Sequence, residues 1–434
     1  MGKKGFLSVV VASVLMSAFM WGFTQEARAI PAFSRSTQAP CALCHTGFPK
    51  LNAFGMMFKQ NGYRMPGQEG KFLWEQPIPL SGQISFSYRY RKDNWNPEVV
   101  GLIGMPELPD RKSSALGMDG WELLAGGTVA PRVSFLGAIG GEVSGLAPDA
   151  GIDPATGMPD TATTEIETEA FVIQFNDLVS DARLNLRIGK DHIDNYFLST
   201  PRRLTEAPYL IQIQPMLGPS LMPTSVGAEL NGFLPVGFRY AAGVRNYGSA
   251  YDSKNNNEQR VGAVYVWANQ DILGQTVSFI VSSDRAGDAN VGADDQTLGY
   301  GASLDLSVWR INIIPGVFWY REGDRIRGGN RLEVVSGTLE AIYPILPTLL
   351  GTLRYDFNNW DIKNDPLNRD ARQYVVSLAW YSYPNIRCVA EYSRLSTANL
   401  MPVGAPGGIM LMDTGAAESD LRQDKATLLV QVTF

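Results

Sequence analysis

Alternating polar and apolar residues recur along most of this chain, in segments of about ten residues separated by turns or polar loops, from residue 80 onward. In residues 80–91, Ile84, Phe86 and Tyr88 fall on one face of an extended strand, and serines and arginines fall on the other. Residues 299–307 and 349–358 repeat the pattern. A soluble sandwich also alternates, but its core does not usually hold arginine and aspartate on one face of so many strands. The pattern therefore predicts a transmembrane β-barrel with a polar lumen and a lipid-facing apolar exterior.

Sixteen strands are predicted, and an even number closes an antiparallel barrel. Their expected starts lie near residues 80, 119, 131, 164, 181, 224, 236, 258, 274, 295, 309, 330, 347, 371, 385 and 424. Tight turns alternate with longer segments at 93–118, 144–163, 191–223 and 396–423, an asymmetry typical of outer-membrane barrels. We therefore predict a mainly β fold, with a 16-stranded antiparallel porin-like barrel over residues 80–434.

Residues 1–29 have the features of a secretory signal peptide. Lys3 and Lys4 give a charged start, an apolar core follows, and Ala27-Arg28-Ala29 matches the small-residue pattern of a cleavage site. An uncleaved inner-membrane anchor is the alternative, because the apolar stretch is long enough for one. We expect an exported chain that begins near Ile30 after cleavage.

A Cys-x-x-Cys-His motif follows the expected cleavage site, as Cys41-Ala42-Leu43-Cys44-His45. This is the attachment signature of a c-type haem, in which two thiols form thioethers with the porphyrin and the next imidazole ligates the iron. The alternatives are a short-loop disulfide or half of a zinc site, but the sequence has no second Cys/His pair to complete a tetrahedral site. The motif predicts one covalent haem, with Cys41 and Cys44 as anchors and His45 as proximal ligand.

Residues 30–79 form a candidate haem module ahead of the barrel. Phe48, Leu51, Phe54 and Phe58 fall at helical spacing, which predicts a short apolar face in a small helical module. This face serves as a small core, packs on the porphyrin, or does both. Without the haem, so small a module could hardly bury enough surface to fold. We expect it to plug the barrel lumen.

The sixth ligand of the iron has few candidates in this sequence. His192 is the only histidine besides His45, and Met56, Met57 and Met65 lie in the module itself. An open or water-bound site is a further alternative. The charged stretch that begins at residue 190 and contains His192 and Arg203 is either a solvated external loop or an inward-folded constriction of the pore.

The net charge and the remaining residues of interest narrow the possible partners of the chain. The formal net charge of −6 argues against nucleic acid as a partner. Cys388 is the only cysteine outside the motif, so no disulfide framework is implied, and its neighbours predict that it faces lipid. Glu165, Glu167 and Glu169 make an acidic row that could attract a cation, but we favour a solvated strand end as its explanation.

Four segments near the amino terminus carry a resemblance to a known family: Ile30-Pro31-Ala32-Phe33-Ser34-Arg35, the Cys41–His45 motif, Phe48-Pro49-Lys50-Leu51-Asn52-Ala53-Phe54-Gly55 and Phe58-Lys59-Gln60-Asn61-Gly62-Tyr63. They resemble the amino-terminal region of the fused outer-membrane cytochrome-porins of iron-oxidising bacteria. Cys41, Cys44 and His45 carry over residue by residue, whereas the barrel is matched only as architecture. The resemblance implies one haem c, extracellular Fe(II) as electron donor, a periplasmic cytochrome or copper protein as acceptor, and a bacterial outer-membrane location.

These expectations combine into one functional hypothesis with two rivals. The protein would be an oxidoreductase of the Fe(II)-oxidising cytochrome type that moves electrons without acid or base chemistry. A haem held inside the barrel would shorten the transfer across a hydrocarbon layer that is roughly 30 Å thick. The rivals are a transport porin with an accessory haem and a conduit that reduces an external acceptor.

Overall fold

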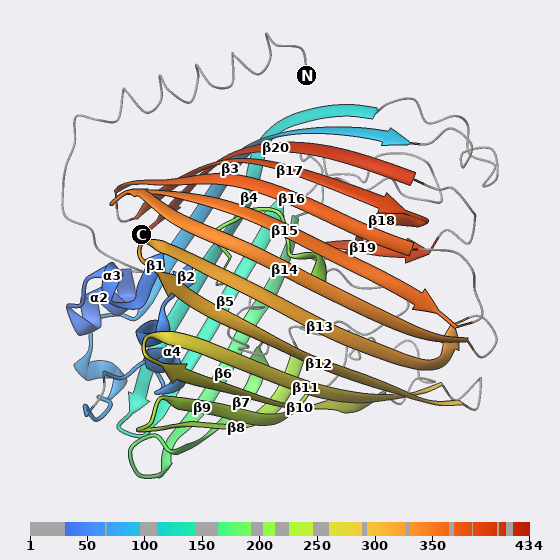
Figure 1. The fold of residues 1–434 in the computed structure, drawn as a ribbon. Coiled ribbons are helices and arrows are strands. Elements are labelled where there is room, and N and C mark those ends of the chain that lie inside the picture. The colour runs from blue at the N-terminus through green and yellow to red at the C-terminus, as the bar shows by residue number, and fades with distance from the viewer. Residues whose placement is uncertain are drawn as a thin grey trace.

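The computed structural model describes residues 31–65, 67–95, 111–143, 164–191, 203–212, 225–245, 260–288, 293–326, 330–363, 369–383, 385–405, 408–413 and 420–434. The predicted signal peptide at residues 1–29 and the candidate ligand His192 lie outside these residues. The described part of the chain forms a β-barrel with a small amino-terminal module at one of its ends (Figure 1).

Sixteen of the described strands pair in one closed antiparallel barrel, in which the last strand returns to the first. They are β3 (Leu80–Trp95), β4 (Arg111–Ala130), β5 (Val133–Val143), β6 (Thr164–Val179), β7 (Leu184–Asp191), β8 (Ser225–Leu234), β9 (Phe238–Arg245), β10 (Arg260–Ile272), β11 (Gln275–Asp288), β12 (Ala293–Val308), β13 (Ile311–Ile326), β14 (Asn330–Leu346), β15 (Leu349–Ile362), β16 (Arg369–Tyr383), β17 (Ile386–Ala398) and β20 (Asp420–Thr433).

The predicted fold class is confirmed, because the sixteen strands occur where the alternation placed them. Only β4 and β20 begin more than three residues from the predicted start. β4 begins earlier, at Arg111, because it pairs along nearly the whole of β3, as far as the partners Asp93 and Arg111. The hairpin of β18 (Leu400–Ala405) and β19 (Gly408–Asp413) was not predicted, and its two strands form a separate two-stranded sheet.

The side chains of each strand divide between the lumen and the exterior. Along β15 the exposure alternates strictly, with Thr352, Arg354 and Asp356 buried on the inward face and Leu353 exposed on the outward face. Cys388 likewise lies on the outward face of β17, beside the inward Arg387. The outward apolar face suits lipid, as the alternation predicted.

The lumen departs from the uniformly polar lining that the alternation predicted. Trp267 on β10, Phe318 on β13 and Trp360 on β15 are buried on the inward face and belong to one apolar cluster. Leu204 and Leu210 pack into the same cluster from residues 203–212. That segment contains η3 (Leu210–Gln212). The apolar lining therefore exists because a chain segment inside the barrel, rather than water, covers it.

The amino-terminal module comprises α2 (Pro31–Thr37), α3 (Cys41–Cys44), β1 (His45–Gly47), β2 (Lys50–Leu51), α4 (Ala53–Gln60) and η1 (Leu73–Glu75). Its helices gather at the end of the barrel where short turns join the strands, on the left in Figure 1. We call this the short-turn end. Within the described residues, no helix is both long enough and apolar enough to cross a bilayer.

Candidate haem-attachment site and its seat in the barrel

The Cys-x-x-Cys-His motif forms a single helical turn that continues directly into a strand. Cys41 and Cys44 are the first and last residues of α3, and residues three positions apart share a face of a helix. Both thiols are half-buried and free, so no disulfide joins them. Burial raises the pKa of both thiols. His45 opens β1, so the two thiols and the imidazole lie within one short stretch of backbone.

Asn52 connects this turn to the next helix. Its backbone N–H donates to the Cys44 carbonyl over 2.9 Å, and its side-chain Nδ2 donates to the Leu43 carbonyl over 3.0 Å. Its Oδ1 accepts from the backbone N–H of Gly55 at 2.9 Å, which caps the amino terminus of α4. A Cβ at Gly55 would overlap the Cys44 carbonyl oxygen. The close packing of α4 on the motif therefore requires a glycine at this position.

The imidazole of His45 is enclosed by the module. His45 pairs with Leu51 across the β1–β2 hairpin, and its ring centre lies 5.5 Å from that of Phe48. Burial lowers the pKa of His45 to about 4, against the opposing influence of the backbone of Pro49 and Lys50. The ring is therefore neutral at neutral pH, as a metal ligand must be.

The residues present fit a covalently attached haem. Two free thiols on one helical turn, followed by a neutral imidazole, supply the anchors and the axial ligand of a c-type haem. Elsewhere in the described chain, no three His, Cys, Asp or Glu side chains gather into a metal site.

The predicted apolar stripe is only partly helical. Phe54 and Phe58 lie on α4, but Phe48 and Leu51 lie in and beside the β1–β2 hairpin, since Asn52 caps the helix and prevents it from starting earlier. Phe58 is buried, and its ring centre lies 5.6 Å from that of Phe33 on α2. The stripe thus contributes to a small aromatic core that includes residues outside the predicted face.

The candidate sixth ligands of the module occupy different environments. Met56 is buried on α4, the helix that packs on the motif, and Met57 beside it is half-buried. Met65 is half-buried and follows Arg64, which anchors the module to the barrel.

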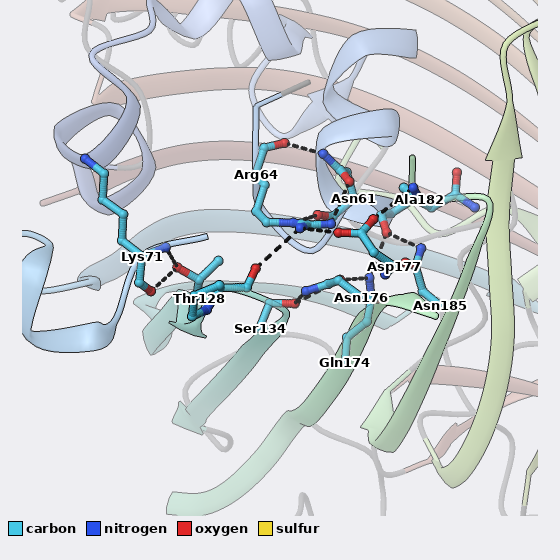
Figure 2. Close-up of polar contacts among 12 residues, drawn as sticks. Asn61, Arg64, Lys71, Thr128, Ser134, Gln174, Asn176, Asp177, Ala182 and Asn185 are labelled. Carbon is cyan, nitrogen blue, oxygen red and sulfur yellow. Dashed lines mark hydrogen bonds and ion pairs between the residues drawn. The ribbon is translucent and has the colours of Figure 1, made fainter. Parts of the chain in front are cut away.

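Arg64 is the main polar anchor of the module on one side of the barrel (Figure 2). Its Nη1 donates to Asp177 Oδ2 on β6 over 2.6 Å and to the Pro131 carbonyl in the β4–β5 turn over 3.4 Å. Its Nε donates to the Asn61 carbonyl over 3.0 Å, and its Nη2 donates to the Asn61 side-chain oxygen over 3.1 Å. Asn61 thus fixes the guanidinium in the orientation that reaches the barrel. We call these contacts of Arg64 the Arg64 latch.

Further hydrogen bonds seat the end of α4 on the barrel wall beside the latch. The carbonyl of Gln60 accepts from Gln174 on β6 over 2.7 Å and from Asn185 on β7 over 3.3 Å. Gly62 follows with a φ of +65°, and a Cβ there would overlap Asn176, so the chain turns where only glycine fits without strain.

The segment after the latch reaches β4, as Figure 2 also shows. Thr128 Oγ1 donates to the carbonyl of Lys71 over 2.7 Å and accepts from its backbone N–H over 3.0 Å. The module is thereby held at successive points along residues 60–71.

A second set of contacts holds the module to the opposite side of the barrel. Lys50 is buried, and its Nζ donates to Asn312 Oδ1 on β13 over 2.8 Å and lies 4.0 Å from Glu340 on β14. The Tyr381 hydroxyl on β16 donates to the Phe48 carbonyl over 2.6 Å. Because β6 and β14 lie on opposite sides of the ring, the module spans the mouth of the barrel.

Residues 203–212 fold into the lumen, which favours the constriction over the solvated loop for this part of the predicted stretch. The backbone N–H groups of Glu206 and Ala207 donate to the Glu391 carboxylate on β17, over 2.7 and 2.6 Å. Arg354 donates to the Ala207 carbonyl over 2.8 Å, and its guanidinium carbon lies 4.3 Å from the centre of the Tyr209 ring. We call residues 203–212 the lumen segment.

The predicted acidic row is interrupted by a change of register. Glu165 pairs with Glu142 and Glu167 with Gly140, but Ala138 pairs with Ala170 and Ile139 with Thr168. Glu169 is therefore the extra residue of a bulge, and its side chain is exposed.

No protein-family model and no curated relative matches this chain. Solved structures match it, at low sequence identity. The anion-selective porin from Comamonas acidovorans gives a TM-score of 0.55 at 12% identity, with 82% of this chain and 99% of that one covered. The chain has a porin fold. The outer membrane channel DcaP of Acinetobacter baumannii matches with a TM-score of 0.57 at 12% identity, and Salmonella typhi OmpF in complex with daunomycin matches with a TM-score of 0.53 at 9% identity. Each of these two matches covers 82% of this chain and 97% of the other chain.

Proposed function

We propose that this protein is an outer-membrane oxidoreductase that carries one haem c, takes electrons from extracellular Fe(II) and passes them to a periplasmic cytochrome or copper protein. The observation that carries the proposal is the Cys-x-x-Cys-His turn in the barrel mouth, where two free thiols at the ends of α3 are followed directly by a neutral imidazole. When bound, the haem would supply one-electron chemistry. Cys41 and Cys44 would hold it covalently, and His45 would ligate its iron.

The position of the module supports transfer of an electron rather than of a solute. Short turns are periplasmic in outer-membrane barrels, so the short-turn end would face the periplasm, where an acceptor protein can reach the module. The lumen segment lies inside the barrel and the module lies across its mouth, and together they fill part of the space that a solute would need. An electron can tunnel through packed protein, whereas a hydrated ion needs an open path.

The choice of Fe(II) as donor rests on the resemblance of residues 30–63 to the cytochrome-porins. Oxidation of iron at the cell surface has a chemical rationale, because the ferric product is poorly soluble and would accumulate inside a cell. A conduit that reduces an external acceptor would use the same residues with a haem of lower potential.

The test is anaerobic mixing of the purified, oxidised full-length protein with Fe(II), while the haem absorbance is followed. We expect covalent haem in the wild type, its loss in a Cys41→Ala, Cys44→Ala double variant, and reduction of the haem by Fe(II). A haem that stays oxidised from acid to neutral pH, with a potential below that of the iron couple, would refute iron oxidation. Absence of covalent haem would refute the whole proposal.

A transport porin with an accessory haem is the second candidate, and the porin fold favours it. It requires a water-filled path through the lumen. Conductance of the purified protein in a planar bilayer tests it: open-pore conductance together with a haem that no donor reduces would favour transport.

A further inference from the structure

We propose that Lys50 and Glu340 form a buried charge pair that sets the reduction potential of the haem at His45. The inference rests on the proposed function, since it concerns a haem bound at Cys41 and Cys44. Lys50 would act as a positioning residue that holds the haem-binding hairpin against the barrel and places a buried positive charge between the hairpin and the barrel wall. Glu340 would supply the opposing charge from the barrel wall.

Lys50 belongs to the same hairpin as His45. It is paired with Gly47 and precedes Leu51, the partner of His45, so the backbone that carries the imidazole and the backbone that carries the ammonium are adjacent. Its side chain is only 4% exposed and reaches Asn312 and Glu340. A buried charge on the hairpin that carries the metal ligand is screened weakly by solvent.

Glu340 is fixed as firmly as Lys50. Its side chain is 1% exposed, its Oε1 lies 4.0 Å from Lys50 Nζ, and its Oε2 accepts from the Tyr209 hydroxyl of the lumen segment over 2.8 Å. The carboxylate therefore joins the module to the lumen segment, and it cannot turn to solvent without losing both contacts.

The other charged groups around the pair are also held in place. Asp305 accepts a hydrogen bond from the amide of Asn312, which itself binds Lys50. On the far side of Tyr209, Arg354 forms an ion pair with Asp356 at 3.0 Å. Each of these neighbours has a partner of its own, so replacing Lys50 or Glu340 changes the charge beside the hairpin by one unit.

The sign of each effect follows from electrostatics. Fe(III) carries one more positive charge than Fe(II), so a nearby cation favours the reduced state and a nearby carboxylate favours the oxidised state. Lys50→Met should therefore lower the midpoint potential of the haem, and Glu340→Gln should raise it. The double variant should fall between the two single variants, and Lys50→Arg should preserve the wild-type value. A purely structural role would move the potential in the same direction in both single variants, because each breaks the same contact.

The experiment is a redox titration of the full-length, haem-loaded protein in detergent, followed by haem absorbance. The matched control is the ion pair between Arg394 on β17 and Asp424 on β20, joined over 2.6 Å. Arg394 lies eight residues along the strand from the start of β17, roughly 26 Å away from the short-turn end. Arg394→Met and Asp424→Asn make the same charge changes and should leave the potential unchanged. Glu340→Gln is isosteric and keeps an acceptor for Tyr209, so it tests the inference even if Lys50→Met does not fold.

Shifts of opposite sign in Lys50→Met and Glu340→Gln support the inference. Unshifted potentials, or shifts of the same sign, overturn the inference while leaving haem binding and the proposed function intact. Absence of covalent haem from the wild type overturns the proposed function and this inference with it.

Discussion

Substitution of Arg64 by methionine should release the module from one side of the barrel without unfolding the barrel. Methionine keeps the apolar stem of the side chain and removes the guanidinium, so the four hydrogen bonds to Asn61, Pro131 and Asp177 are lost together. The barrel strands pair with one another independently of these contacts. The loss should therefore appear as local opening of the module.

The magnitude follows from the burial of the two partners. Removing one member of a fully buried ion pair costs about 3–5 kcal/mol. The Arg64 side chain is 5% exposed, but that of Asp177 is 20% exposed and keeps a hydrogen bond from the Ala182 backbone N–H over 2.9 Å. Solvent thus compensates part of the loss, so Arg64→Met should lower the free energy that holds the module on the barrel by about 3 kcal/mol. Since 1.36 kcal/mol corresponds to a factor of ten, the opening equilibrium should increase on the order of 100-fold.

Hydrogen exchange followed by mass spectrometry measures this opening directly. Amides of α4 should exchange on the order of 100-fold faster in Arg64→Met, while amides of β15 keep their wild-type rates. Asp177→Asn should have a smaller effect, because the amide oxygen still accepts from Arg64. Arg394→Met, which removes an arginine that does not touch the module, is the control. Unchanged exchange in α4 of the Arg64→Met variant would refute the reasoning that the Arg64 latch holds the module.

Two further predictions concern the motif and the lumen. Gly55→Ala should destabilise the packing of α4 on α3 by on the order of 2 kcal/mol, because the alanine Cβ would overlap the Cys44 carbonyl oxygen, although alanine is the better helix former. The yield of covalent haem should therefore fall in this variant and stay unchanged in the control Ala53→Ser, which alters an exposed residue of the same helix. Equal yields in the two variants would contradict the predicted overlap. Arg354→Met should loosen the lumen segment, since it removes the hydrogen bonds to the Ala207 and Pro208 carbonyls and leaves Asp356 buried without its ion pair. Single-channel conductance in a planar bilayer should then rise above that of the wild type and of the control Arg394→Met. Equal conductance in all three proteins would show that the lumen segment does not limit the pore.

The residues around the candidate site differ in how strongly the sequence marks them. Lys50, Arg64 and Glu340 look like ordinary charged residues, because nothing local marks them as buried. Asn52 and Gly55 carry a weak signal, since an asparagine three residues before a glycine is compatible with a helix cap. The apolar lining of the lumen was visible in the sequence, although the alternation elsewhere drew attention away from it. In the stretches around Trp267 and Phe318 both faces of the strand are apolar, which indicates that lipid covers one face and protein covers the other.

The sequence by itself determined the barrel and the candidate haem motif, because both are local patterns. Strand alternation depends only on neighbours two positions apart, and Cys41, Cys44 and His45 are almost contiguous. Only the tertiary structure decided where the motif sits and what surrounds it. Arg64 meets Asp177 across 113 positions of sequence, and Lys50 reaches Asn312 across 262. Periodicity assigns a side chain to the lumen face, but closure of the ring determines which inward side chains meet the module, and no local pattern encodes that closure.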